Sequence, residues 1–283
     1  MNDKKDLSIL NCIGTSFLAV FITVPGHELF HALTSLAYGD KIIIYSGTAV
    51  KPADIINYEA LSPFNRIMVG GGSASILNTV IGIILAIILL KCSMGPTLRL
   101  FLTQLMGAQM CQGFGYFLIG VFGAGDWGMV YSYLSDMPGL INALRIVLAI
   151  LGSAGVVISF FLLNHMSYYF IEDTADKKEK RTVAFKLHLL MFILGTAIVV
   201  YTTLIGPHYK SGGLSIGTVI LFNFMWIPFF WGFMFTGVMK VNQPKESRLL
   251  YKLPEKPNYI LIAAGIILIA IDIFVFGPGI YFN

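Results

Sequence analysis

The sequence predicts an all-α, polytopic membrane protein with about seven transmembrane helices and one short β-element. Of its 283 residues, 56% are hydrophobic and only 12% are charged, whereas a soluble domain carries about a quarter charged residues. Several apolar stretches reach the roughly 20 residues that a helix needs to cross a bilayer. Short segments with Gly and Pro separate most of them, and these residues favour turns.

The apolar stretches define the expected helices in chain order. No short apolar segment with a small-residue cleavage site precedes the first stretch, so we expect that stretch to be a retained helix and not a signal peptide. The segment 41–50, KIIIYSGTAV, is too short to span and rich in β-branched residues, which favours a strand or hairpin. The expected helices are 8–37, 66–90, 98–122, 140–163, 184–205, 215–239 and 259–277.

The first helix is longer than a span requires. Residues 8–37 would extend about 45 Å at 1.5 Å per residue, against a hydrocarbon core of about 30 Å. Pro25 lacks an amide donor and Gly26 follows it, so we expect this helix to be kinked or broken there.

The basic residues are unequally divided between the two sides of the predicted bundle. Fourteen of the nineteen Lys and Arg residues lie in or beside the N-terminus and the loops at 91–97, 164–183 and 240–258. The positive-inside rule then predicts a cytoplasmic N-terminus. Because the basic residues lie in short loops between apolar runs, we expect the lipid bilayer as a partner and no nucleic acid.

The segment VPGHELFHAL (24–33) contains His27, Glu28 and His31 within an apolar run. Residues four apart lie on one face of a helix, so both imidazoles can hold one ion, and Glu28 can act as general base. Ionisable residues inside a span are costly and usually functional. The pattern is the H-E-x-x-H motif of zinc hydrolases and predicts Zn²⁺ as cofactor. A polar packing cluster is the competing interpretation.

A catalytic zinc takes three protein ligands and leaves one position open. Asp126 is our candidate for the third ligand, because it follows the third predicted span between Gly125 and Gly128, on the same side of the membrane as His27. The rivals are other acidic and histidine side chains, of which Asp272 is an intramembrane acid on that same side. The remaining rivals are Glu59, His165, His188 and His208.

Polar residues on the second and third predicted spans indicate either helix packing or a water-accessible cleft. On the third span, Gln109, Gln112 and Tyr116 recur at helical spacing, with Gln104 near the same face. On the second, Asn78 follows a run of small residues and can hold a neighbouring helix or bond a substrate backbone. The three cysteines, Cys12, Cys92 and Cys111, are too far apart to suggest a disulfide framework or a thiolate metal cluster.

These residues resemble the site-2 protease superfamily of intramembrane zinc metalloproteases, and most closely its divergent bacterial branch. HELFHALTSLAYGDKIIIYSGTA is similar to that branch's metal-motif segment with its following β-element, and GDWG (125–128) to the aspartate–glycine segment. GGSASILN (71–78) is similar to the glycine and asparagine element of the middle core helix. Trp127 separates the aspartate from the glycine that usually follows it directly.

The resemblance implies zinc on His27, His31 and Asp126, catalysis by Glu28 and substrate contact by Asn78. It covers a three-helix core at 1–135, with four further helices of the same membrane domain at 136–283, and it implies a bacterial cell membrane. The expected activity is metalloendopeptidase hydrolysis of peptide bonds in a membrane protein or peptide. The alternatives are a metal-binding membrane protein without protease activity and an ion-coupled transporter, which would spread ionisable residues across membrane depth.

Overall fold

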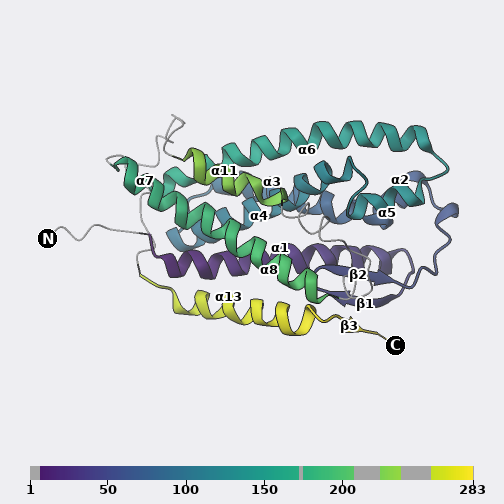
Figure 1. Cartoon of the computed structure of the whole chain (residues 1–283), viewed down its shortest axis with the longest axis horizontal. Helices are drawn as coiled ribbons and strands as arrows, with labels where there is room; N and C mark the ends of the chain where they lie inside the picture. The colour runs from purple at the N-terminus through teal and green to yellow at the C-terminus, as the bar shows by residue number, and fades with distance from the viewer. Residues whose placement is uncertain (1–6, 172–174, 207–223, 237–255, 283) are drawn as a thin grey trace.

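The fold of the chain is mostly helical, with one small sheet, in a computed structural model that describes residues 7–171, 175–206, 224–236 and 256–282. The helices run roughly along the long axis of the molecule (Figure 1). They are α1 (Ile9–Ala37), α2 (Pro63–Ile67), α3 (Ser73–Lys91), α4 (Pro96–Gly120), α5 (Asp126–Tyr133), α6 (Pro138–Ser167), α7 (Lys177–Ala184), α8 (Leu190–Ile205), α11 (Ile227–Phe235) and α13 (Tyr259–Ile271).

Five helical segments are long and apolar enough to cross a membrane: Ile9–Ala37, Pro63–Lys91, Pro138–Phe170, Lys177–Ile205 and Tyr259–Phe276. They coincide with five of the seven predicted spans, so the composition identifies a membrane protein. Of the predicted span 215–239, only 224–236 lies within the described residues, where a short 3₁₀ turn leads into α11.

The remaining predicted span, 98–122, is α4, a 25-residue helix that is not among the five apolar segments. Almost all of α4 from Arg99 onward is buried. It packs against α1, α3 and α6 in the interior of the bundle. A helix whose neighbours are protein on every side does not need a fully apolar surface, which explains why α4 contains Gln104, Gln109 and Gln112. Seven spans therefore remain a prediction.

The first helix is continuous. α1 is helical from Ile9 to Ala37 with Pro25 inside it, so the break expected at Pro25 and Gly26 is not present. The Tyr45 hydroxyl donates a hydrogen bond of 2.8 Å to the Pro25 carbonyl, which ties the sheet to this part of the helix. Farther toward the N-terminus, α1 crosses α13 closely, because Gly14 and Gly265 have no side chains to separate the two backbones.

The predicted β-element is a hairpin, completed by a third strand from the end of the chain. β1 (Ile42–Ser46) pairs antiparallel with β2 (Ala49–Pro52), and β3 (Ile280–Tyr281) pairs antiparallel with the other edge of β1. The order is β2-β1-β3. Figure 1 shows the sheet, α2 and α5 at one end of the molecule and α7 at the other. β3 was not predicted.

Two short segments support the end of the molecule that holds the sheet. The π-helical turn Met68–Gly72 joins α2 to α3 and packs on α5. Arg66 in α2 is buried and donates hydrogen bonds to the carbonyl oxygens of Glu59, Leu61 and Tyr133. It also forms an ion pair with Asp136 at 2.8 Å. This one side chain therefore connects the loop before α2 to the turn between α5 and α6.

Candidate metal centre

His27 and His31 lie one turn apart on α1, and their ring nitrogens face each other. The two Nε2 atoms are 3.2 Å apart, and the ring centroids are 4.8 Å apart. The helical spacing predicted this proximity, because side chains at i and i+4 lie on the same face.

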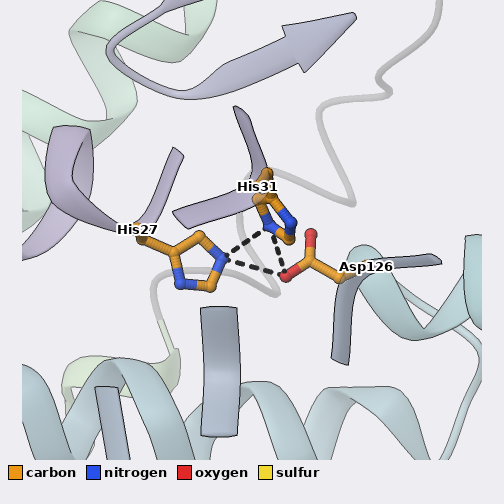
Figure 2. Close-up of side chains that lie close together, drawn as sticks. All are labelled: His27, His31 and Asp126. Atoms are coloured by element: carbon orange, nitrogen blue, oxygen red, sulfur yellow. Dashed lines mark hydrogen bonds and ion pairs between the residues drawn. The ribbon is translucent and has the colours of Figure 1, made fainter. Parts of the chain in front are cut away.

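Asp126 reaches the two histidines from the first residue of α5. α4 ends at Gly120, and the chain then turns back through Gly123 and Gly125, which have φ of +71° and +61°. Glycine adopts such positive φ values without the penalty that other residues incur. The turn places Asp126 Oδ2 2.9 Å from His27 Nε2 and 3.2 Å from His31 Nε2 (Figure 2). We call these three residues the histidine–aspartate cluster.

The three facing atoms of the histidine–aspartate cluster lie slightly closer together than the ligand atoms of a tetrahedral zinc site. Zinc bonds to nitrogen and oxygen of about 2.0–2.1 Å place neighbouring ligand atoms about 3.3 Å apart. The measured separations are 2.9, 3.2 and 3.2 Å. Two imidazoles and one carboxylate are also a donor set that suits zinc. Among the described residues, this is the one group of three or more His, Cys, Asp or Glu side chains close enough to share an ion.

The cluster is closed on one side and open on another. His27 is fully buried, whereas the side chains of His31 and Asp126 are 14% and 17% exposed. A fourth ligand can therefore approach from the side of His31 and Asp126. Burial alone would raise the pKa of Asp126, but the adjoining His31 and His27 lower it well below its usual range. The carboxylate is consequently ionised.

Glu28 follows His27 directly and is buried. It is close enough to His31 and Asp126 to interact electrostatically with both, but it does not belong to the group of possible ligands. Glu28 is therefore a buried carboxylate next to the cluster and separate from it.

Asn78 and Tyr116 surround the ring of His27. Asn78 on α3 is fully buried, and its amide nitrogen lies 3.1 Å from His27 Nδ1. The ring of Tyr116 on α4 stacks on the imidazole, with a centroid distance of 4.5 Å and an interplanar angle of 24°. Sequence spacing predicted a polar face on α4 and a polar residue on α3, but it could not show that both contact the same histidine.

Most of the rival third ligands lie elsewhere. Asp272 is buried against Gly47, in the turn between β1 and β2. His188 contacts the hydroxyl of Ser167 in the core. Neither Glu59 nor His165 joins the histidine–aspartate cluster. His208 lies outside the described residues.

A groove separates the sheet from α5. It has a volume of about 540 Å³ and is lined by residues of all three strands and by Met129 and Tyr133 of α5.

On the opposite face of β1, Tyr45 points to α1. Burial, then the negative charges of Glu28 and Asp272, raise the pKa of Tyr45 above its usual range, so its hydroxyl remains a hydrogen-bond donor.

No protein-family model, curated protein or solved structure matches this chain.

Proposed function

We propose that the protein is an intramembrane zinc metalloprotease that hydrolyses peptide bonds of membrane-associated proteins or peptides. One observation carries the proposal: Oδ2 of Asp126, from α5, lies within 3.2 Å of Nε2 of His27 and of His31 on the apolar helix α1, and Glu28 follows His27 directly. The proposed ligands are therefore His27, His31 and Asp126.

These three residues would hold a zinc ion, which would supply Lewis-acid chemistry for the activation of water and the polarisation of a carbonyl. Glu28 accepts the proton of the attacking water and transfers it to the leaving amine, as a general base and then a general acid. Burial of Glu28 and His27 excludes bulk water from that side, so the water that reacts enters past His31 and Asp126.

The groove between the sheet and α5 is lined in part by the helix that carries Asp126. Met129 lies one turn after Asp126 on α5 and lines the groove. A helical peptide bond is shielded by its own hydrogen bonds, so the substrate has to unwind before it is cut. We propose that an extended segment of the substrate lies in this groove.

We also propose that the N-terminus is cytoplasmic and that the membrane is a bacterial cell membrane. The basic residues of α7, among them Lys177, Lys178 and Arg181, lie at the end of the molecule opposite to the sheet (Figure 1). Positively charged segments favour the cytoplasmic side. The cluster then lies toward the extracytoplasmic side. Labelling of single cysteines introduced in α7 and in the β1–β2 turn, in intact cells, tests this orientation.

The activity is tested by comparing zinc content and cleavage in four purified proteins: wild type, Glu28→Gln, His31→Ala and Glu59→Gln. Zinc is measured by mass spectrometry, and cleavage with casein and with a fluorogenic peptide that carries one apolar span. We expect about one zinc per chain in the wild type, in Glu28→Gln and in Glu59→Gln, and none in His31→Ala. Only the wild type and the Glu59→Gln control should cut.

The other outcomes discriminate the alternatives. Cleavage by Glu28→Gln would exclude Glu28 as the base. Stoichiometric zinc without cleavage in any of the proteins would favour a metal-binding protein that is not a protease. Absence of zinc from the wild type, even after reconstitution, would mean that the histidine–aspartate cluster only packs helices together. The ion-coupled transporter would then be the remaining alternative.

A further inference from the structure

Asn78 contacts the one nitrogen of His27 that the proposed metal site does not use. His27 directs Nε2 to Asp126 and His31, and directs Nδ1 to the amide of Asn78 at 3.1 Å. Asn78 is 0% exposed, so its side chain lies behind His27 and away from the open side of the cluster. From this position Asn78 can influence the proposed metal site through its contact with His27.

The chemistry of imidazole determines what Asn78 has to provide. A neutral imidazole carries one N–H, and a metal ion binds the nitrogen without the proton. An ion on Nε2 therefore requires the proton on Nδ1. A hydrogen-bond acceptor facing Nδ1 favours that tautomer, and such outer contacts commonly set the orientation of metal-binding histidines.

The amide of Asn78 can supply this acceptor. A rotation of 180° about its last side-chain bond exchanges the amide nitrogen and oxygen without moving any other group. With the nitrogen toward His27, Oδ1 has no hydrogen-bond partner among the described residues. With the oxygen toward His27, Oδ1 accepts from the Nδ1–H group, and Nε2 keeps its lone pair for the ion.

The neighbouring elements hold this contact in place. The Thr34 hydroxyl on α1 donates to the Ser73 hydroxyl on α3 at 3.0 Å, which joins the two helices near the cluster. The Tyr116 ring lies almost parallel to the imidazole and restricts its plane. Asn78 then fixes the rotation of the ring within that plane.

We infer that Asn78 is a positioning residue of the metal site: its amide oxygen holds the proton of His27 on Nδ1 and so directs Nε2 to the ion. The inference rests on the proposed function, because it presupposes that His27 binds a metal. It assigns to Asn78 a role that does not require contact with a substrate.

Zinc affinity of the full-length protein tests the inference without any substrate. The affinity is measured by competition with a chromophoric chelator for wild type, Asn78→Leu, Asn78→Asp and Asn164→Leu. Asn164 is the matched control, because it is another fully buried asparagine in an apolar helix, where it accepts a hydrogen bond from Thr236. We expect Asn78→Leu to bind zinc about 10–100-fold more weakly. Asn78→Asp, which keeps the acceptor, and Asn164→Leu should bind as the wild type does.

Three outcomes would overturn the inference. They are wild-type affinity in Asn78→Leu, an equal loss in Asn78→Asp, and an equal loss in Asn164→Leu. Failure of the proposed function would give a different result from these three outcomes, because the wild type itself would then bind no zinc. In that case the inference about Asn78 would fail as well.

A second measurement is made on the wild type, and a variant serves only to assign the signal of His27. Nitrogen-15 NMR of the zinc-bound protein with labelled histidine, with His27 identified by its substitution, reports which ring nitrogen carries the proton. We expect a slowly exchanging proton on Nδ1 of His27. A proton on Nε2, or a rapidly exchanging proton on Nδ1, would contradict the role of Asn78.

Discussion

Gly71 lies directly against Asp126: a Cβ atom added to Gly71 would sit 2.5 Å from the Cβ of Asp126. Gly71 also has φ of +127°, a conformation that other residues rarely adopt. In the sequence, Gly71 is part of the run of small residues that precedes Asn78 on the second predicted span. In the structure Gly71 makes room for the carboxylate that completes the histidine–aspartate cluster.

Gly71→Ala should therefore weaken zinc binding. The added methyl group must displace Asp126 or strain the backbone, and such strain costs about 1–3 kcal/mol. We expect a loss of zinc affinity of about tenfold or more, as for other residues that support metal ligands. Chelator competition measures it. The control is Gly139→Ala, where the added Cβ meets nothing within 4 Å, and an equal loss there would contradict the explanation.

Zinc affinity should fall as the pH is lowered. His27 and His31 must be neutral to bind, and imidazole has an ordinary pKa of about 6.5, so protons compete with the metal increasingly below that value. We expect progressive release of zinc between about pH 7 and 5, followed with a fluorescent zinc indicator. A pH-independent affinity over this range would exclude histidine ligands.

Arg66→Met should destabilise the protein far more than Asp136→Asn. Arg66 is buried and donates to three carbonyl oxygens, and a hydrogen bond to a charged group contributes about 1.5–3 kcal/mol. The side chain of Asp136 is 56% exposed, and an exposed ion pair contributes about 0–1 kcal/mol. Thermal unfolding in detergent compares the two variants. An equal loss of stability in the two variants would mean that the ion pair with Asp136, and not the contacts with the carbonyl oxygens, accounts for the contribution of Arg66.

Gly47→Ala should be destabilising, and Asp272→Ala should relieve the effect. A Cβ on Gly47 would overlap the carboxylate of Asp272, and overpacking of this kind typically costs about 1–3 kcal/mol. With Asp272 shortened to alanine, the new methyl group has space. A double-mutant cycle of unfolding free energies should give a coupling of about 1 kcal/mol or more. Additive effects would show that the two residues do not interact.

The sequence predicted those parts of the fold that depend on local pattern. The apolar runs located five helical segments that are long and apolar enough to cross a membrane, and the β-branched segment at 41–50 located the β1–β2 hairpin. The i, i+4 spacing predicted that His27 and His31 share one face of a helix, and the direction of the next spans predicted that Asp126 lies on the same side of the membrane. In the structure the Asp126 carboxylate contacts both imidazoles.

The features that sequence reasoning missed depend on contacts between distant segments. β3 consists of Ile280 and Tyr281, too few residues to form a pattern, and it exists because β1 offers an unpaired edge. Asn78 is one polar residue on an apolar helix, and its partner His27 is 51 positions away. The 98–122 span was expected from its length and its polar face was recognised, but the near-complete burial of α4 depends on helices elsewhere in the chain that its own sequence does not show.

The pairing of β3 with β1 has a consequence for the biosynthesis of the protein. Residues 280 and 281 leave the ribosome long after His27, His31 and Asp126 have been made. The histidine–aspartate cluster can form while the sheet still consists of two strands. Tyr281 lines the groove beside α5, so the groove gains its third strand only after every other residue that lines it has been made. Under the proposed function, a nascent chain would be able to bind zinc before its substrate groove is complete.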